Sequence, residues 1–303
     1  MQKDNIIDNR YSIISKIGSG GFGVVYTVKD EQENGGPYAA KIFKILKGVD
    51  REIEILNILK DLHNPFIINI IDYSDKGTII RNGKIFKDKK YCILEYAPKN
   101  NLLQYIDSAG KLKEDHCKFI FHKILKAINA IHSKGIYHLD IKPENILLDE
   151  HFEPKITDFG LSIKIDETKD GHFEGSRGTP NFMPPQMFLL GKQIFNPIKA
   201  DIFSLGATLF NLAGGYFGFD RAKEKDFYYR YIKENTEKSI EKYWKKVETQ
   251  KNLKFSDLFK KLYIKMVSFN EDNRPSIEDI LNDEWFAEIF DEEKRKIIDQ
   301  EFC

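Results

Sequence analysis

Residues 137–148, YHLDIKPENILL, place several polar side chains between two apolar flanks. The potentially reactive residues are His138, Asp140, Lys142, Glu144 and Asn145. Asp, Pro and Asn are also ordinary turn residues, so a loop between an apolar helix at 120–131 and a short strand at 146–148 would look similar. Taken alone, the segment is compatible with either interpretation.

A second polar segment, KITDFGLS, places Asp158 directly after another short strand. The side-chain oxygens of Asn145 and Asp158 suit Mg²⁺ that is bound together with substrate phosphates. Asp140 then remains to act on the substrate.

The glycine-rich segment IGSGGFGVVY places Gly18, Gly20 and Gly23 between two strand-like segments. Glycine lets backbone N–H groups approach a phosphate closely because no Cβ intervenes. The dinucleotide-binding alternative requires these glycines to open a helix, but the following VVYTVKD is β-branched and alternating. A glycine hairpin lying over phosphates is therefore the favoured functional interpretation.

The segment YAAKIF places Lys41 on a predicted strand. Its side chain is either exposed to solvent or a cation in a cleft that is lined by small apolar side chains. Two acids on the following helix could pair with it, Glu52 and Glu54, which lie about 200° apart around the axis. Glu52 has apolar neighbours at the offsets expected of a buried position, namely Ile53, Ile55, Leu56 and Leu59. The periodicity favours Glu52 as the partner.

The elements that position these residues change character along the chain. Residues 11–95 contain short alternating segments typical of an antiparallel sheet, interrupted by one helix at 50–62 with Asp50 as its N-cap. Asn82-Gly83 predicts a hairpin over 79–93. After Ala97 the helical period dominates, which predicts a boundary between two lobes.

Composition restricts the classes of function. At 303 residues the chain is long enough for two lobes, and its 47 basic and 47 acidic residues create no strong field toward nucleic acid or an anionic membrane. Aromatic and basic residues at 221–254 could suggest a nucleic-acid surface, but acidic residues in the same segment cancel their charge. Solvated amphipathic helices are therefore the better interpretation of this segment. The apolar segment at 200–220 contains Asp201, Ser204 and Asn211, so it predicts a buried helix rather than a membrane span. Three separated cysteines and the absence of a secretory signal predict the cytosol or nucleus.

Four histidines fall close together and raise the question of a metal site: His116, His122, His132 and His138. His116 and His122 would lie roughly 240° apart on one helix, so they cannot share a ligand face. We therefore expect these histidines to be hydrogen-bonded within the protein or exposed to solvent, and not to be metal ligands.

Four motifs together resemble the catalytic domain of eukaryotic protein kinases: GSGGFGVV, AAK, HLDIKPEN and DFG, in this order and at sensible spacings. The resemblance covers about residues 11–290 and implies an α+β, bilobal fold. It comprises an N-lobe at 11–97, a small antiparallel sheet with one main helix, and a larger, mainly helical C-lobe at 98–290. An N-terminal extension (1–10) and a short charged tail (291–303) would flank them.

The resemblance implies specific catalytic roles. Lys41 would hold the α- and β-phosphates of ATP and pair with Glu52, Asp140 would orient the attacking hydroxyl and accept its proton, and Lys142 would steady the transferred phosphoryl group. Lys142 together with Thr179 in GTPNF is similar to serine/threonine kinases. The HLDIKPEN segment also resembles the calcium/calmodulin-dependent group.

The resemblance further implies ATP and Mg²⁺ as cofactors, with Asn145 and Asp158 as metal ligands. The hinge would bind adenine through the main chain of Glu95 and Ala97, beside Leu94 at the gatekeeper position. The nucleotide contacts implied in all are Ile17, Gly18, Gly20, Gly23, Val25, Ala39, Lys41, Leu94, Glu95, Ala97 and Leu147.

One departure from the family pattern is Leu139, which stands where the family usually carries an Arg before the catalytic Asp. That Arg normally binds a phosphate on the activation loop. We therefore expect activity without activating phosphorylation, although three loop hydroxyls are available as acceptors: Ser162, Thr168 and Ser176.

A second departure is Gln186 in the segment PPQ, where the family has a Glu that pairs with an Arg resembling Arg274. A buried Arg without a partner would cost stability. We expect Asp201 or Asp272 to compensate.

The sequence thus predicts an ATP-dependent serine/threonine protein kinase acting on protein substrates, with no nucleic-acid partner and no membrane span. The alternative is a pseudokinase that binds nucleotide or serves as an interaction scaffold. The presence of Lys41, Asp140, Asn145 and Asp158 argues against it, since degenerate members commonly lose one of them. A small-molecule phosphotransferase is less favoured because GTPNFMPPQ resembles a peptide-docking segment.

Overall fold

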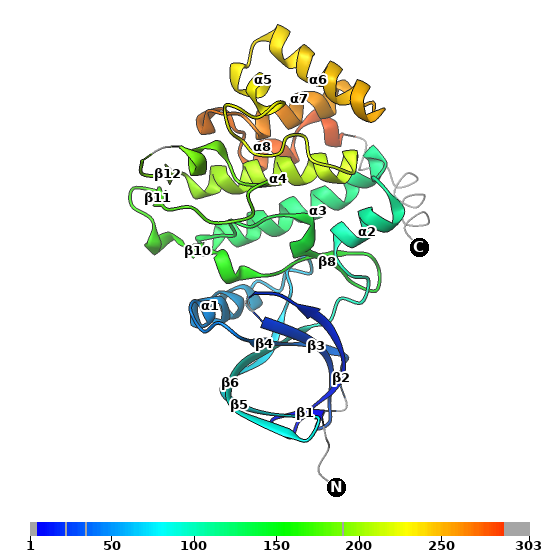
Figure 1. Ribbon diagram of the computed structural model, residues 1–303, viewed down its shortest axis with the longest axis vertical. Coiled ribbons are helices and arrows are strands. Elements are labelled where there is room, and N and C mark those ends of the chain that lie inside the picture. The colour runs from blue at the N-terminus through cyan, green and yellow to red at the C-terminus, as the bar shows by residue number, and fades with distance from the viewer. Residues whose placement is uncertain (1–4, 22, 34, 190, 288–303) are drawn as a thin grey trace. The chain divides into compact units, whose positions relative to one another are not determined.

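A computed structural model describes residues 5–21, 23–33, 35–189 and 191–287 (Figure 1). The chain divides into two compact units, Met1–Pro98 and Lys99–Cys303. The first is built from strands with one helix and the second is mainly helical, so the predicted α+β fold is confirmed.

Six antiparallel strands of the first unit close into a barrel in the order β1-β2-β3-β4-β6-β5. Their bounds are β1 Asn5–Ile7, β2 Tyr11–Ser19, β3 Gly23–Asp30, β4 Tyr38–Phe43, β5 Ile70–Arg81 and β6 Lys84–Glu95. The closure was not predicted, because β1 lies within the segment expected to be an extension. Ile6 and Ile7 of β1 are buried, and β1 pairs with both β2 and β5.

The hairpin between β5 and β6 turns at Asn82-Gly83, as predicted. Both residues have positive φ (51° and 72°), and Arg81 pairs with Lys84 across the turn. Positive φ at both central positions defines the primed turn that matches strand twist. The paired strands run from Ile70 to Glu95 and extend beyond the predicted hairpin.

The single helix of the first unit, α1, spans Val49–Lys60. Its N-cap is Gly48 in the left-handed conformation, so the expectation of Asp50 as N-cap was wrong. Asp50 lies in the first turn, where a carboxylate interacts favourably with the helix dipole. The helix ends at Lys60, two residues before its predicted end at residue 62.

In the second unit, α4 packs against α3 and α7 and is buried along nearly its whole length. The helices are α2 Leu102–Ala109, α3 Glu114–Ser133, α4 Pro197–Gly214, α5 Tyr229–Glu234, α6 Glu237–Lys251, α7 Asp257–Met266 and α8 Ile277–Leu281. Asn196 caps α4 by accepting from the N–H groups of Ile198 and Lys199, and Pro197 occupies the first turn. Burial on all sides explains why this helix has so few charges.

Short strands and 3₁₀ helices connect these helices and carry the polar motifs. The strands are β7 Ile136–Tyr137, β8 Ile146–Leu148, β9 Pro154–Ile156, β10 Ile163–Lys164, β11 Phe173–Glu174 and β12 Ile194–Phe195. The 3₁₀ helices are η1 Pro143–Asn145, η2 Phe159–Leu161, η3 Ile165–Glu167, η4 Pro185–Phe188, η5 Glu271–Asn273 and η6 Glu284–Phe286. Among the described residues, no helix is both long and apolar enough to cross a membrane.

Candidate active site

The glycine-rich segment forms the hairpin between β2 and β3. The N–H of Gly20 donates to the carbonyl of Gly23 at 2.9 Å, which closes the turn. A Cβ on Gly23 would lie 2.5 Å from the carbonyl oxygen of Ile42 on β4, so glycine is required there by the approach of two backbones. A Cβ on Gly20 would meet open space, which leaves the tip of the hairpin accessible to a ligand.

Lys41 on β4 contacts Glu52 on α1, with Nζ and Oε1 2.5 Å apart. Glu52 is 5% exposed, and its helix neighbours Ile53, Ile55 and Leu56 are buried with it. The helical periodicity therefore identified the acid on the buried face. Such a pair holds the lysine side chain in one orientation because both charges are withdrawn from water.

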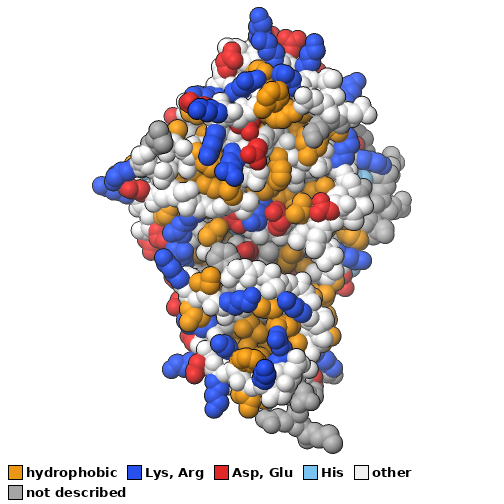
Figure 2. Space-filling model, viewed as in Figure 1, with side chains coloured by type: hydrophobic (Ala, Val, Ile, Leu, Met, Phe, Trp, Pro, Cys, Tyr) orange, Lys and Arg blue, Asp and Glu red, His pale blue; other side chains and the backbone are white. Residues whose placement is uncertain are grey.

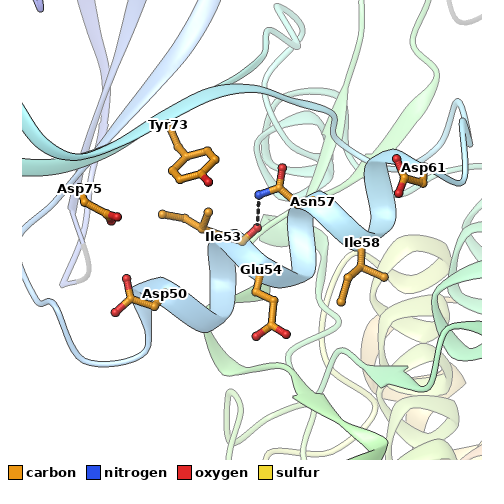
Figure 3. A pocket seen from close by; sticks show the side chains of 8 residues that line it. All are labelled: Asp50, Ile53, Glu54, Asn57, Ile58, Asp61, Tyr73 and Asp75. Atoms are coloured by element: carbon orange, nitrogen blue, oxygen red, sulfur yellow. Dashed lines mark hydrogen bonds between the residues drawn. The ribbon is translucent and has the colours of Figure 1, made fainter.

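Glu54 lies on the opposite, exposed face of α1 and lines a cavity of about 550 Å³ (Figure 3). Figure 3 shows Asp50, Asp61 and Asp75 around the same cavity. Asp50 and Asp75 both contact Lys90, so part of this acidic surface is already neutralised.

The remaining nucleotide-contact candidates of the first unit follow its strands. Val25 and Lys41 are paired residues on β3 and β4, and Ala39 is paired with Leu94 on β6. Ala39 and Leu94 are buried, whereas Ile17 is exposed and Ala97 half-buried. Gly18 lies on β2 beside Val25.

Glu95 ends strand β6, and its backbone is fixed at that point. Its N–H donates to the carbonyl of Asn69 at 2.8 Å, and its side chain accepts from the N–H of Asn69 at 3.2 Å. Leu147, the last nucleotide-contact candidate, belongs to the second unit, where it lies on β8 and bridges to Asn101.

In the second unit, Asp140 is the centre of a hydrogen-bond network. The amide nitrogen of Asn145 donates to the Oδ2 and carbonyl oxygens of Asp140 at 3.0 and 2.9 Å. The hydroxyl of Thr179 donates to Oδ1 at 2.8 Å, and Lys142 lies 3.0 Å from Oδ2 and 2.6 Å from the Thr179 hydroxyl. The arrangement brings Asp140, Lys142 and Asn145 together and adds Thr179, whose contact the sequence did not predict.

Asp201 on α4 holds the backbone of this loop. Its carboxylate accepts from the N–H groups of His138 and Leu139, and from His132 Nε2, each at 2.8 Å. Asp201 is 0% exposed, so its carboxylate is satisfied by these donors rather than by water. In the sequence, Asp201 is one acid within a largely apolar helical segment, which shows that it is buried but not which donors it binds.

Asp158 follows β9 and adopts a left-handed backbone conformation with φ of 65°. The preceding Thr157 donates its N–H to the carbonyl of Asn145 at 3.0 Å, which ties the two candidate metal-binding segments together. The next residue, Phe159, is buried against the ring of His138, with ring centroids 5.1 Å apart.

These residues fit a magnesium site of the predicted kind. Both hydrogen bonds of the Asn145 side chain are donated by its nitrogen, so its Oδ1 remains as an oxygen ligand. Mg²⁺ is usually bound by one or two protein oxygens together with phosphates and water, and Asn145 and Asp158 supply such a pair. No group of three or more His, Cys, Asp or Glu residues within the described ranges could hold a metal, and His132 and His138 are engaged in hydrogen bonds.

Leu139 is buried in an apolar cluster that includes the loop following Asp158. The cluster comprises Tyr137, Leu139, Ile163, Phe173, Met183, Met187, Phe195 and Ala200. Phe173 belongs to β11, which pairs with β12 through Phe195. Ser162 in this loop is fully buried and donates to the carbonyl of His138, so the expectation that it is available for phosphorylation was wrong. Ser176 is exposed.

Arg274 is buried and is satisfied by uncharged acceptors. Its guanidinium donates to Gln186 Oε1 at 2.7 Å and to the carbonyls of Ser268 and Lys199 at 3.0 and 2.9 Å, and it lies over the ring of Phe203. Burial lowers the pKa of Arg274 to about 10, so it remains charged at neutral pH. The expectation of Asp201 or Asp272 as its partner was wrong, because the carboxylate of Asp201 binds the His138 loop and the contacts of Arg274 are to amide and carbonyl oxygens.

A strand unit with a buried lysine–glutamate pair, followed by a helical unit with an Asp-Lys-Asn loop and a DFG segment, defines the protein kinase class. The family described as "Protein kinase domain" matches residues 11–286. The chain belongs to this family.

Among curated proteins, the chain is similar to CBL-interacting protein kinases of plants. It is 31% identical over 290 residues to CBL-interacting protein kinase 9 of Oryza sativa subsp. japonica, covering 93% of this chain and 57% of the relative. It is 30% identical over 302 residues to CBL-interacting protein kinase 32 of the same plant, covering 97% and 62%. CBL-interacting serine/threonine-protein kinase 12 of Arabidopsis thaliana is 29% identical over 310 residues, covering 98% and 57%. The chain therefore spans 57 to 62% of the length of these relatives.

Proposed function

We propose that this chain transfers the γ-phosphoryl group of ATP to Ser and Thr hydroxyls of protein substrates. The single observation that carries the proposal is the network around Asp140, in which Asn145, Lys142 and Thr179 hold one carboxylate in a fixed position. Phosphoryl transfer depends mainly on positioning and on charge stabilisation, which such a preorganised network provides.

Asp140 is proposed to orient the substrate hydroxyl and to accept its proton as the bond to phosphorus forms. Lys142 lies on the same carboxylate and would balance the negative charge of the transferred group. Lys41, oriented by Glu52, would bind the α- and β-phosphates of ATP. Mg²⁺, when bound by Asn145 and Asp158, would neutralise phosphate charge.

Nucleotide binding is proposed for the glycine hairpin and for the end of β6. The open tip at Gly20 allows backbone N–H groups to approach phosphates, and the tethering of Glu95 to Asn69 gives the adenine-binding backbone a defined conformation. The apolar Val25, Ala39 and Leu94 lie on adjoining strands and would contact the base.

We further propose that activity does not require phosphorylation of the loop after Asp158. The apolar cluster around Leu139 supports this, because Phe173 and Met183 anchor the loop by packing where the family commonly uses an Arg and a phosphate. The β11–β12 pairing adds a backbone anchor to the same loop.

The first test is Mg²⁺-dependent transfer of labelled phosphate from ATP to a Ser/Thr peptide library, with Asp140→Asn as the comparison. Loss of general-base catalysis is expected to lower the rate by about 10²–10⁴-fold. ATP binding with no transfer by the wild type would instead favour the pseudokinase alternative.

The second test treats the active protein with a phosphatase, which is expected to leave its rate unchanged. Abolished activity would contradict the proposal that activity does not require phosphorylation of the loop after Asp158.

The names of the plant relatives describe kinases that interact with CBL. Because the chain spans only part of their length, our proposal concerns phosphoryl transfer alone. We propose the cytosol or nucleus as its location, because the three cysteines are few and far apart in the sequence. Fractionation of expressing cells tests this proposal.

A further inference from the structure

A hollow of about 320 Å³ lies at one end of the barrel, where β3 and β6 begin and β4 and β5 end. Its apolar walls include Tyr26, Phe43 and Ile79, which are buried, and Phe86, which is 40% exposed. Barrel ends are frequent binding sites because inward-pointing side chains cannot close the opening completely. Tyr26, Phe43 and Ile79 are recessed, whereas Phe86 is partly exposed at the rim.

Three cations from different strands or their ends also line the hollow: Lys44, Arg81 and Lys89. Within the part of the chain that the structure describes, none of them contacts a carboxylate. Lys44 lies 3.5 Å from the hydroxyl of Ser19, and Arg81 donates to the hydroxyl of Tyr26 while lying over its ring.

Two other cations of the same unit, Arg10 and Lys90, are by contrast paired with acids. Arg10 contacts the buried Asp30, and Lys90 contacts both Asp50 and Asp75. The chain as a whole has no net charge, so the uncompensated positive charge at the hollow is a local feature. On the face shown in Figure 2, hydrophobic side chains of the barrel unit are surrounded by Lys and Arg side chains.

We propose that this hollow is a docking site for an acidic segment of a partner protein that inserts one large apolar side chain. The recessed apolar walls would bury that side chain, and Lys44, Arg81 and Lys89 would pair with its flanking carboxylates. A membrane surface is less compatible, because insertion into lipid requires apolar side chains that protrude. The hollow borders the glycine hairpin through Val24 and Tyr26, but Gly18, Gly20, Gly23, Lys41 and Glu52 do not line it. Binding there does not depend on phosphoryl transfer.

The test measures binding of a fluorescein-labelled peptide, composed of Glu and Asp around one Trp, to the full chain in the absence of ATP. Lys44→Glu/Lys89→Glu is expected to weaken binding by about 10-fold or more, because attraction becomes repulsion. Arg81 is left in place because its hydrogen bond to Tyr26 supports the barrel wall. The matched control is Lys29→Glu/Lys76→Glu, which makes the same charge change on exposed residues of β3 and β5 that do not line the hollow.

The control is expected to bind within about twofold of the wild type, since a distant exposed charge is screened. A peptide with Ala in place of Trp is expected to bind about 10-fold more weakly, as burial of the aromatic ring is lost. Equal weakening by both charge reversals, or equal binding of the Trp and Ala peptides, would overturn the proposal. The proposal would also be overturned if the peptide did not bind while phosphatidylserine vesicles or an oligonucleotide did, and if that binding required Lys44 and Lys89. Equal melting temperatures by circular dichroism ensure that both variants are folded.

Discussion

The amide N–H of Leu139 donates to the buried carboxylate of Asp201 at 2.8 Å, while its side chain packs in the apolar cluster beside the loop that follows Asp158. One residue thus connects the backbone of the catalytic loop to α4 and, through its side chain, to Phe173 and Met183. Leu139 has a positive φ of 59°, a conformation that is unfavourable for a non-glycine residue and persists only where surrounding contacts fix it. The acceptor on Asp201 provides such a contact.

Asp201→Asn is expected to destabilise the chain by about 2–4 kcal/mol. An amide retains one acceptor oxygen but places an N–H₂ group against one of the two backbone donors, which leaves buried polar groups unsatisfied. Urea denaturation monitored by circular dichroism measures the change. The exposed Asp166→Asn serves as control, and an equally small effect of both substitutions would contradict the assigned role of Asp201.

Leu139→Arg is expected to lower stability by about 2 kcal/mol or more rather than to create a phosphate-dependent switch. The guanidinium would enter an apolar cluster without an acid, and burial of an unpaired charge is costly. Leu139→Met, which conserves volume, is the matched variant and should cost less than about 1.5 kcal/mol. A Leu139→Arg protein as stable as the wild type would show that the cluster does not anchor the loop.

Glu52→Gln is expected to lower kcat/KM for peptide phosphorylation by about 100-fold, since Lys41 would lose the charge that orients it. Glu54→Gln changes the same chemical group on the exposed face of α1 and should leave the rate nearly unchanged. Steady-state kinetics of the two variants measures both effects. A larger effect of Glu54→Gln would contradict the assignment of Glu52 as the acid that orients Lys41.

Gln186→Leu is expected to cost about 2–3 kcal/mol of stability, because Arg274 loses an acceptor and the carbonyl of Phe269 loses a donor. Gln186→Glu keeps the acceptor for Arg274 and adds a compensating charge, so its melting temperature should not fall. Differential scanning calorimetry of both variants compares the two effects. A lower melting temperature for Gln186→Glu would indicate that the bond to Phe269 outweighs the charge.

The environment of Asp30 predicts that the barrel loses stability at low pH. The hydrogen bond from Arg10, together with backbone N–H donors from Gln32 and Glu33, holds the pKa of Asp30 below its usual value. A depressed folded-state pKa contributes stability above the unfolded pKa of about 3.9, and this contribution is lost as the pH falls through the folded pKa.

Asp30→Asn should therefore lower the free energy of unfolding at pH 7 and make it less dependent on pH below about 4. Urea titrations at several pH values provide the measurement, with the exposed Asp88→Asn as control. An unchanged pH dependence in Asp30→Asn would contradict the argument.

Local sequence patterns predicted much of the fold because they act over a few residues. The 3.6-residue period selected Glu52 rather than Glu54 as the buried acid of α1, and Asn82-Gly83 predicted a turn that only residues tolerant of positive φ adopt readily. The order of the glycine, lysine, catalytic-loop and DFG motifs identified the kinase class before any contact was known. Each of these patterns or motifs consists of residues that are close together in the sequence, so it can be recognised without knowledge of tertiary contacts.

Tertiary structure alone decided the features that join distant segments. The closing of the barrel by Asn5–Ile7, the binding of Leu139 by Asp201 and the satisfaction of Arg274 by Gln186 connect residues more than 60 positions apart. No local period specifies such partners, because a buried polar group pairs with whichever complementary donor or acceptor packing brings within reach. The sequence by itself therefore determined which residues could perform the chemistry, and packing determined how each one is held.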